Sequence, residues 1–581
     1  MPDCAKAPTK GAPARSRSPT NSSGSAIPQD EPADIAHEHP RSDRGNSQSE
    51  TMEAEPKPQY PKGARLFFIY LGLLLVVLVT GLDRSIIATA VPKITSDFNS
   101  LPDVGWYGSA YLLTACCFQL LFGKLYVEFN TKWVFLAALV IFEVGSTVCA
   151  AAPNSIAFII GRAVAGVGCA GLIAGSLIII AETAPIHKRP KYTGIVGGSI
   201  GIAQIIAPTL GGVFADQLTW RWCFWINLPM GGITLITILI FLYVAPRSVS
   251  SEPFNLKAFL VRIDLLGTMF IMPAIIALLI ALQYGGKTYS WNNWRIILCL
   301  VIFSVLTLIW LYHEFRLGEK ATVPLRIIKQ RSVAASVLFT LTGFSNFFIM
   351  TYWVPIWFQS VRDNSAQQSG INYLAATIAM SITTILTGFA ISKTGHYAPP
   401  MIASSIIMPI GAGLIYTFNI STTTGFWVGA LILFGVGMGL GAQAPVMAVQ
   451  TVLSGHDIAI GTALTVFMQS LASAIFLSVS DNVFQQHLVA ELAATVPAVD
   501  PAIVIANGAS GLRGVMQVRY PEFVDGILVA YNQALRRVFL VGLVLTCLSI
   551  FGSASVEWVS VLQNKQESKE EAHSSEKEEK K

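Results

Sequence analysis

The sequence predicts an all-α membrane protein that crosses the lipid bilayer many times. Hydrophobic residues make up 53% of its 581 residues, charged residues make up only 13%, and the mean hydropathy is +0.56. A soluble domain carries roughly 25% charged residues because its surface must face water. Apolar runs of about 20 residues, the length of a membrane-spanning helix, also recur along the chain. These observations exclude the soluble multidomain protein that the length alone would suggest.

The apolar runs predict fourteen membrane-spanning helices. We expect them at 66–91, 104–126, 133–152, 156–182, 194–216, 222–244, 264–283, 294–312, 333–358, 370–392, 399–418, 425–452, 458–480 and 538–560. Residues 1–62 are rich in Pro, Ser and Ala, which predicts a disordered cytoplasmic tail. Residues 561–581 end in KEEKK and are expected to form a second, charged cytoplasmic tail.

A weak internal repeat divides these helices into two groups of six. Gly123 and Gly388 each lie in similar runs before a predicted cytoplasmic loop, and the run Gly166–Gly171 resembles the run Gly435–Gly439. Both correspondences are offset by eight helices, which gives an arrangement of six, two and six helices, like the parallel repeats known in transporters. The expected units are an N-terminal bundle at 63–245, two inserted helices with linkers at 246–330, and a C-terminal bundle at 331–560 with a long outer loop at 481–537.

The distribution of Lys and Arg predicts the orientation of the chain in the membrane. With the N-terminus inside, the cytoplasmic loops hold many cations, such as Lys132 and Arg189, whereas the short outer loops hold few. The net charge of +5 is therefore attributed to topology, and no nucleic-acid partner is expected. Asn419 begins an Asn-Ile-Ser sequon in a predicted outer loop, so it is a candidate glycosylation site.

Four ionisable residues lie deep within apolar runs, namely Asp83, Arg84, Glu143 and Arg162. A central Asp or Arg costs about 2.5 to 3.5 kcal/mol to insert, so such residues usually face a cavity or a partner. Asp83 and Arg84 project about 100° apart on their helix, and we therefore expect Asp83 to pair with Arg162 of another helix. The pair either couples proton movement to transport or permanently fixes helix packing.

Pro208, Gly211 and Gly212 interrupt the fifth predicted helix. Proline kinks a helix by removing a backbone hydrogen bond, and glycine allows a partner helix to approach closely. The motif is interpreted as a hinge or a tight seal, with an ordinary kink as the alternative. The run Gly166–Gly171 matches a dinucleotide-binding pattern in spacing, but no strand precedes it, so helix packing is the better interpretation.

Aromatic, amide and acidic side chains within the spans are candidates for the wall of a substrate cavity. These residues are Tyr111, Gln119, Glu143, Tyr352, Trp353, Gln359 and Gln469. Tyr and Trp near the ends of spans also form interfacial belts, which is the alternative interpretation. The sequence offers no nucleophile with a nearby base and no metal-ligand cluster, so neither an enzyme nor a bound metal or cofactor is expected.

Several runs resemble signatures of the fourteen-helix drug:proton antiporters of the major facilitator superfamily, and most closely those of the fungal toxin and multidrug efflux group. The runs are Leu82–Pro92, Ile160–Gly166, Ala207–Gly212 and Trp220–Pro229, and the resemblance covers roughly residues 65–560. It implies a major facilitator fold that exports small, mostly hydrophobic compounds in exchange for protons by alternating access.

The resemblance also implies roles for particular residues. Asp83 would carry or gate the proton, Arg162 would tune its affinity, and the motif that begins near Pro208 would limit leakage. Gly123 and Lys132 correspond to a gating loop between the second and third helices.

The chain departs from the family pattern at several positions. The gating loop has Val127 where the family motif has Asp, and Thr131 where it has a basic residue. Helix 4 has Ala165 where Gln is frequent, and helix 5 has Ala207 where Gly is usual. These departures put the conformational latch attributed to the loop in question.

The expected partners are a small-molecule substrate, protons and the lipid bilayer, with no oligomer required. A plasma-membrane location is expected, and the vacuolar membrane is the alternative. Two other functions stay open: transport of another solute, such as uptake or vacuolar transport of basic amino acids, and a non-transporting sensor with the same fold.

Overall fold

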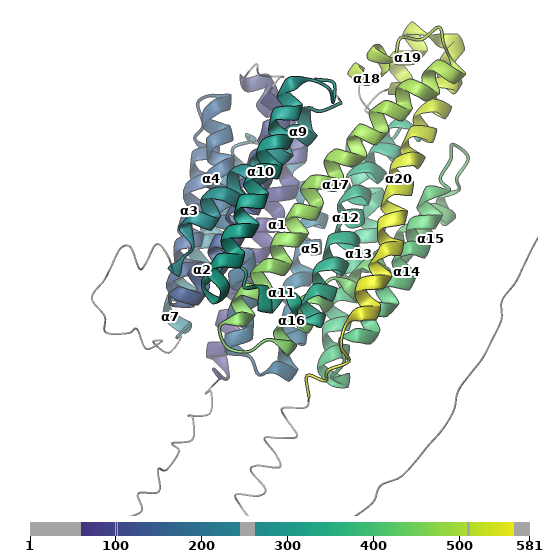
Figure 1. Ribbon diagram of the computed structural model, residues 1–581. Helices are drawn as coiled ribbons and strands as arrows, with labels where there is room; N and C mark the ends of the chain where they lie inside the picture. The colour runs from purple at the N-terminus through teal and green to yellow at the C-terminus, as the bar shows by residue number, and fades with distance from the viewer. Residues whose placement is uncertain are drawn as a thin grey trace, which may run out of the picture. The chain divides into compact units, whose positions relative to one another are not determined.

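The computed structural model describes residues 60–98, 100, 103–243, 262–286, 288–507 and 512–562. Within these residues, 14 helical segments are long and apolar enough to cross a membrane, which confirms the predicted polytopic α-helical fold (Figure 1). Most of the two predicted tails lies outside the described residues. Residues 244–261, at the end of the predicted N-terminal bundle and the start of the predicted inserted segment, lie outside them as well.

The N-terminal bundle consists of α1 to α7. Its helices are α1 (Ala64–Phe98), α2 (Val104–Glu128), α3 (Thr131–Ala150), α4 (Ser155–Thr183), α5 (Arg189–Gln217), α6 (Trp222–Trp225) and α7 (Asn227–Phe241), with a 3₁₀ turn η2 (Ile186–Lys188) before α5. α1 packs against α5 and α7, and α4 packs against both α2 and α3. The short α6 and α7 together form one membrane span.

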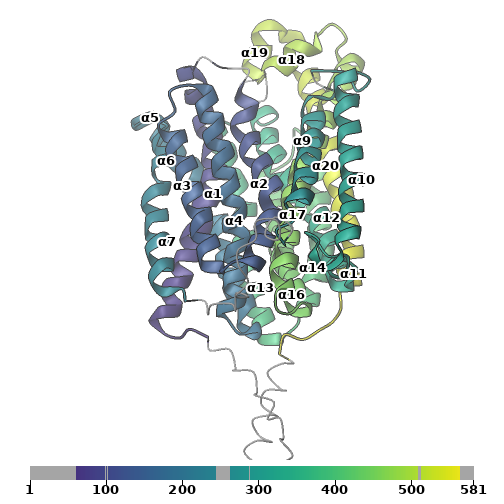
Figure 2. The same cartoon turned by 60° about the vertical axis from the view of Figure 1, so that its left-hand side comes forward.

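The C-terminal bundle repeats this packing pattern. Its helices are α12 (Arg331–Ser360), α13 (Ala366–Thr394), α14 (Ala398–Tyr416), α15 (Thr424–Gly441), α16 (Ala444–Val452), α17 (Asp457–Thr495), α18 (Pro501–Asn507), α19 (Leu512–Arg519) and α20 (Val524–Ser555). α12 packs against α17 and α20, and α15 packs against both α13 and α14. α12 therefore takes the place of α1, and α15 takes the place of α4. Figure 2 shows α1 and α4 in the N-terminal bundle and α12 in the C-terminal bundle.

Glycines at equivalent places make the close helix contacts in both bundles. A methyl group at Gly166 of α4 would lie 2.3 Å from the carbonyl oxygen of Tyr111 in α2. A methyl group at Gly435 of α15 would lie 2.2 Å from the carbonyl oxygen of Ala376 in α13. Because small residues let membrane helices approach closely, the repeated glycine runs are explained by packing, as the sequence predicts.

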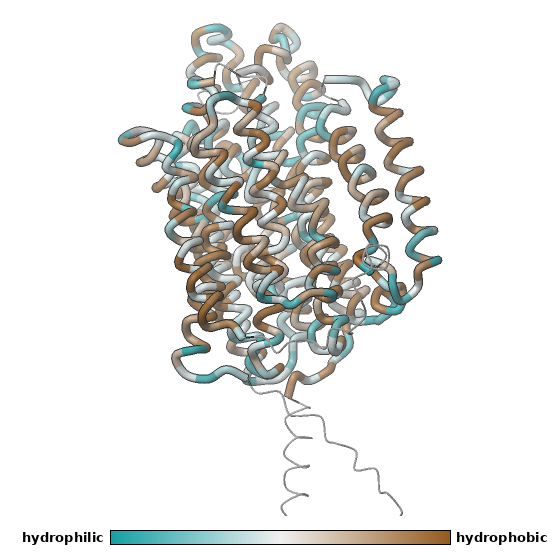
Figure 3. Tube along the Cα trace, turned by 90° about the vertical axis from the view of Figure 1, so that its left-hand side faces the viewer, coloured by the Kyte–Doolittle hydropathy of each residue, from teal (hydrophilic) through white to brown (hydrophobic). Residues whose placement is uncertain are grey.

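Two inserted helices connect the bundles. They are α9 (Leu265–Tyr284) and α10 (Trp294–Leu317), followed by the 3₁₀ turn η3 (Gly318–Lys320) and the short α11 (Leu325–Lys329). α9 packs against α10, α2 and α17, whereas only 6% of the apolar segment of α10 is buried inside the protein. α10 therefore presents its side chains to lipid. Figure 3 shows apolar residues along the lengths of the helices and hydrophilic residues mainly toward their ends.

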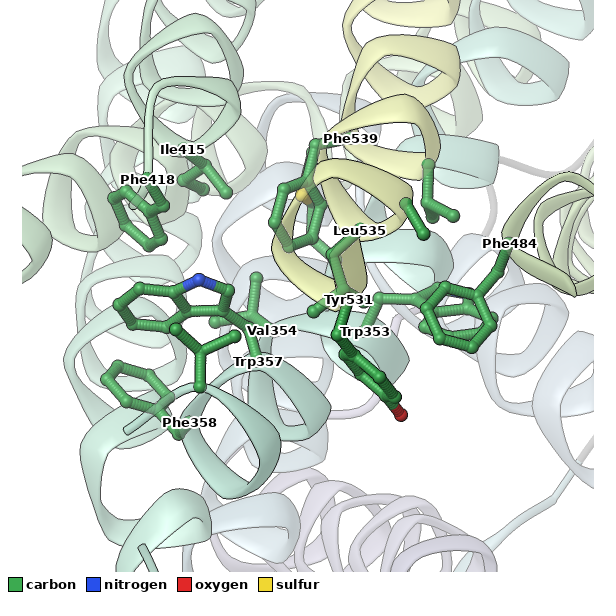
Figure 4. Packing of buried hydrophobic residues seen from close by; sticks show 14 of the residues in the cluster. Trp353, Val354, Trp357, Phe358, Ile415, Phe418, Phe484, Tyr531, Leu535 and Phe539 are labelled. Carbon is green, nitrogen blue, oxygen red and sulfur yellow. The ribbon is translucent and has the colours of Figure 1, made fainter. Parts of the chain in front are cut away.

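The predicted outer loop 481–537 is largely helical, because α17 continues well beyond its expected end and α20 begins before its expected start. Phe484, Leu488 and Leu492 extend an apolar stripe along α17 and lie in one buried cluster with Tyr531 of α20, part of which Figure 4 shows. An amphipathic extension of this kind has no continuous apolar run. A search for continuous apolar runs therefore ends the helices too early.

The two bundles meet along α5 with α13 and along α2 with α17. A methyl group at Gly388 of α13 would lie 2.4 Å from the carbonyl oxygen of Pro190 in α5, and one at Gly123 of α2 would lie 2.6 Å from Cβ of Ala463 in α17. The two glycines thus occupy equivalent places at the two contacts. Both lie toward the end of the bundles with the Lys- and Arg-rich loops, here called the cytoplasmic end.

The variant Gly388→Ala is expected to separate the cytoplasmic ends of α5 and α13, because its methyl group has no room against Pro190. Spin labels at Glu128 and Thr394, introduced in a background without reactive cysteines, measure the separation of the two bundles. The control is Gly429→Ala, since a methyl group there has open space around it. An unchanged distance distribution in Gly388→Ala would show that this contact does not hold the cytoplasmic end closed.

Candidate functional site

A buried ion pair lies between α1 and α4, as the sequence predicts. Nη1 of Arg162 is 2.7 Å from Oδ2 of Asp83, and the two side chains are 1% and 0% exposed. Both residues lie within membrane-spanning segments. Because neither charge reaches bulk water, each depends on the other for compensation.

Arg162 has further partners besides Asp83. Its Nε donates a hydrogen bond to the carbonyl oxygen of Tyr107 at 3.1 Å. Its guanidinium carbon lies 4.4 Å from the ring centre of Tyr111 and 5.8 Å from that of Phe224. Aromatic faces attract a desolvated cation, so Arg162 keeps favourable contacts when the charge of Asp83 is neutralised.

Asn227 and Ser146 complete this site, and the sequence analysis did not select them. Nδ2 of Asn227, at the start of α7, lies 3.3 Å from Oδ1 of Asp83 and 3.1 Å from Oγ of Ser146 in α3. The available signal was the position of Asn227 within the specific run Trp220–Pro229, where it is an amide at the start of an apolar span. The site therefore joins α1, α3, α4 and α7.

Arg84 lies beside this site. Its Nη2 donates to Sγ of Cys169 in α4 at 3.4 Å, and its guanidinium carbon lies 5.7 Å from the ring centre of Tyr111. Tyr111 is 0% exposed and lies within reach of both Arg84 and Arg162. In this conformation Tyr111 supports the ion pair and does not line an open cavity.

Three of the other cavity candidates make helix-to-helix contacts. Gln119 is buried and donates to the carbonyl oxygen of Ala170, which joins α2 to α4. Trp353 is buried and donates from Nε1 to Oγ of Ser480 at 2.8 Å, which joins α12 to α17. Gln119 and Trp353 therefore hold neighbouring helices together in this conformation. Gln359 bridges α12 and α13 at their outer ends through the hydroxyl of Ser369.

Tyr352 and Gln469 differ from Gln119 and Trp353 in exposure. Tyr352 of α12 is 49% exposed, with its ring edge-on to Trp353 at 5.2 Å. Gln469 of α17 is half-buried. Gln359 and Glu143 are half-buried as well, so Tyr352 is the most exposed of the predicted cavity residues.

Hydrogen bonds between the bundles lie near their cytoplasmic ends. Nη1 of Arg189 donates to the carbonyl oxygen of Gln450 at 3.3 Å, and Nε2 of Gln450 donates to that of Leu177 at 3.2 Å. The hydroxyl of Ser392 donates to the carbonyl oxygen of His187. Together with the glycine contacts at 123 and 388, these bonds close the cytoplasmic end.

The two residues of the predicted gating loop lie in different surroundings. Gly123 faces α17 of the other bundle, as described above. Nζ of Lys132 donates to the carbonyl oxygen of Leu239 at 2.7 Å and so joins α3 to α7 within one bundle. Thr131, which stands in the place of a basic residue, donates to Glu182 of α4 at 2.7 Å.

The motif of the fifth helix meets its partner only loosely in this conformation. Pro208 lies inside α5, and its side chain is 3.9 Å from a methyl group built at Gly370 of α13. Gly211 is buried, but a methyl group at Gly212 would have nothing within 4 Å. α5 meets α13 more tightly toward the cytoplasmic end, where a methyl group at Gly201 would be 1.7 Å from Oγ of Ser381.

A cavity of about 240 Å³ opens at the cytoplasmic edge. Its walls come from α2, from the inserted segment and from the start of α17, and include Lys124, Glu128 and His456. Arg326 of α11 also lines this cavity and forms ion pairs of 2.6 Å with Asp457 and 3.0 Å with Glu319. The inserted segment thus contacts the C-terminal bundle beside the Gly123 contact.

Asp264 fixes the insert to its own linker. Its Oδ2 accepts a hydrogen bond of 2.6 Å from the hydroxyl of Thr322, and its Oδ1 lies 2.8 Å from Nε2 of His313. Burial by itself raises the pKa of Asp264, but the hydrogen bonds of Thr322 and His313 outweigh it and hold the pKa below its usual value. Asp264 is therefore an ionised anchor at neutral pH.

Two six-helix bundles related by an internal repeat, closed against each other at one end and holding a buried ion pair, define a secondary transporter. The chain belongs to the Major Facilitator Superfamily, whose sequence model matches residues 73–477. It is therefore a membrane transporter and not an enzyme.

Fungal proteins similar to this chain are named as efflux pumps. The MFS-type efflux pump MFS1 of Arthroderma benhamiae is 47% identical over 518 residues, covering 89% of this chain and 95% of that protein. Efflux pump aflT of Aspergillus parasiticus is 46% identical, covering 88% and 99%. Efflux pump roqT of Penicillium rubens is 44% identical, covering 84% and 90%.

Solved structures of the proton:xylose symporter XylE share the fold. One with a bound bromodeoxyglucose has a TM-score of 0.51 at 16% identity, covering 83% of this chain and 94% of that chain. A double-tryptophan variant of XylE has a TM-score of 0.52 at 16% identity, covering 85% and 96%. At this identity the likeness concerns the fold alone.

Removing one member of the ion pair is expected to destabilise the protein more than removing both. Asp83→Asn leaves Arg162 buried without a counter-charge, and removing one member of a buried pair costs about 3 to 5 kcal/mol of stability. The remaining contacts of Arg162 with Tyr107 and Tyr111 reduce this cost. Combining Asp83→Asn with Arg162→Gln removes both charges and is expected to restore most of the thermal stability. Thermal unfolding in detergent compares the variants. If the double variant loses as much thermal stability as Asp83→Asn, or more, then the two charges do not depend on each other for compensation.

Proposed function

We propose that this transporter exports small, mostly hydrophobic compounds in exchange for protons. The single observation that carries the proposal is the Asp83–Arg162 pair, a carboxylate and a guanidinium buried within the membrane-spanning part of one bundle. Buried intramembrane charges are costly and mark ion pathways in transporters. The names of the fungal relatives favour efflux as the direction of transport.

The ion pair suits proton coupling because its members are compensated unequally. Asp83 has Arg162 and the amide of Asn227 as partners, whereas Arg162 also has a carbonyl oxygen and two aromatic rings. Protonation of Asp83 therefore leaves the guanidinium with several contacts. A proton can then bind and leave without exposing a bare charge to lipid.

The closed cytoplasmic end corresponds to one stage of alternating access. In this stage the bonds of Gln450 and the Gly388 contact separate the central region from the cytoplasm. Export requires this end to open, so that cargo enters from the cytoplasm, and to close again after release. Arg162 and Asn227 tie α4 and α7 to Asp83 of α1, so a change in charge at Asp83 acts on three helices at once.

Tyr352 and Gln469 are the best remaining candidates for contact with the cargo. Both belong to the C-terminal bundle, and both keep exposed surface within membrane spans. Aromatic and amide side chains suit a largely apolar compound that carries a few hydrogen-bonding groups. The coupling site and the cargo site are then in different bundles.

Proton movement in sealed inside-out vesicles with an acidic interior tests the exchange. Ethidium, a rhodamine dye and an anthraquinone are added outside, and collapse of the proton gradient is recorded. The wild type is expected to lose the gradient when a substrate is added, and Asp83→Asn is expected to respond no more than empty vesicles, because its site cannot ionise.

The matched control is Asp525→Asn, since Asp525 is exposed at the outer start of α20. Intact dye-driven proton movement in Asp83→Asn would refute the role of Asp83. Dye accumulation without proton movement in the wild type would contradict the exchange. Absence of both from inserted, folded protein would favour another solute or a sensor.

We also place the transporter in the plasma membrane, with Asn419 glycosylated on the outer side. Asn419 is exposed in the turn between α14 and α15, where its Oδ1 accepts hydrogen bonds from the backbone and hydroxyl of Ser421. Glycosidase digestion is expected to increase the gel mobility of the wild type and to leave Asn419→Gln unchanged. Recovery of the tagged chain in vacuolar membranes would refute the location.

A further inference from the structure

The carboxyl group of Glu143 in α3 is buried without a compensating partner among the described residues. Oε1 and Oε2 are both inaccessible to water, and neither has a hydrogen-bond partner among the described residues. Asp83 differs, because its two oxygens contact Arg162 and Asn227. Glu143 also lies within a membrane-spanning segment, so lipid and protein surround its carboxyl group.

The carboxyl group of Glu143 lies against α7. A methyl group at Gly231 of α7 would be 1.8 Å from Oε1 and 2.5 Å from Cδ of Glu143. A side chain at position 231 would therefore force the carboxyl group of Glu143 to move. The helix Asn227–Phe241 contains no titratable side chain, so α7 offers no cation to balance a carboxylate.

Among the described residues, the cations near Glu143 on the other helices already have partners. Asp83 of α1 carries the same charge as an ionised Glu143, and Arg162 of α4 is already bound to Asp83. Arg84 of α1, the other cation beside this site, donates to Sγ of Cys169 and lies near the ring of Tyr111. An ionised Glu143 would therefore be an unbalanced charge next to another carboxylate, which is strongly unfavourable.

Glu143 also lies about one helical turn from residues of the Asp83–Arg162 site. Ser146 lies one turn along α3 from Glu143, and Asn227 lies one turn along α7 from Gly231. Asn227 links Ser146 to Asp83 through its amide. The Glu143–Gly231 contact and the Ser146–Asn227 contact are thus successive contacts of the same two antiparallel helices.

We propose that Glu143 is a second proton-binding site, held as the neutral acid in the cytoplasm-closed conformation and exchanging its proton with the transport cycle. The coupling part rests on the proposed function. In this arrangement Asp83 is the anion, because Arg162 balances it, and Glu143 is the acid, because nothing balances it. Opening of the α3–α7 contact would admit water to the carboxyl group and release H⁺, leaving the carboxylate.

Infrared spectroscopy of the purified protein in lipid vesicles tests the protonation without any cargo. A protonated carboxylic acid has a C=O stretch above the amide I band, and an ionised one lacks it. The wild type at neutral pH is expected to show this band, Glu143→Gln to lose it, and Asp83→Asn to retain it. Glu522→Gln is the matched control, because Glu522 is exposed in the short 3₁₀ turn η4 (Pro521–Phe523) that precedes α20.

A second pair of variants covers the case in which Glu143→Gln fails to fold. Glu143→Asp keeps the acid but shortens it, so the band is expected to shift in frequency. Gly231→Ala displaces the carboxyl group, so the band is expected to disappear at a lower pH than in the wild type. A band that is absent from the wild type, or unaffected by every change at 143 and 231, would overturn the proposal.

The vesicle assay separates this proposal from the proposed function. If Glu143 contributes to coupling, Glu143→Gln is expected to move fewer protons per dye molecule while Glu522→Gln matches the wild type. An unchanged ratio would refute the coupling role of Glu143. If the wild type itself moves no protons, the proposed exchange fails, and the infrared band still decides whether Glu143 holds a proton.

Discussion

The contact between Asp83 and Arg162 constrains much of the N-terminal bundle. Two opposite charges inside a membrane span are tolerable only when they meet, so α1 and α4 must present these side chains to each other. The rings of Tyr111 and Phe224 and the amide of Asn227 then fill the space around the pair. α2, α6 and α7 are therefore held to the same point.

Close helix packing surrounds this point because α4 is rich in small residues. Gly166 lies against α2, while Gly168 lies against α3, where a methyl group would be 2.4 Å from the backbone nitrogen of Phe142. The C-terminal bundle uses Gly435 and Gly437 in the same way against α13 and α14. Its equivalent interior is nevertheless apolar and aromatic, around Trp353 and Phe484 (Figure 4). The repeat thus preserves helix packing, while the buried Asp83–Arg162 pair belongs to the N-terminal bundle.

The sequence predicted most of the fold, because lipid imposes length and apolarity on every span. It also indicated the Asp83–Arg162 pair, since intramembrane charges of opposite sign need partners. It did not separate Tyr111, Gln119 and Trp353, which are buried among helices, from Tyr352, which keeps exposed surface. The buried and the exposed candidates are residues of the same kinds, so residue type alone does not distinguish them. The direction of a side chain depends on how neighbouring helices are rotated, which one sequence does not encode locally.

By itself, the sequence determined the membrane class, the six, two and six arrangement and the identity of the intramembrane charges. Hydropathy and charge act residue by residue and are visible in a linear chain. Only the tertiary structure decided that Asn227 joins Asp83, that Glu143 lies uncompensated against Gly231, and that the cytoplasmic end is closed. These are relations between helices far apart in sequence, and they depend on rotations and approaches that packing alone sets.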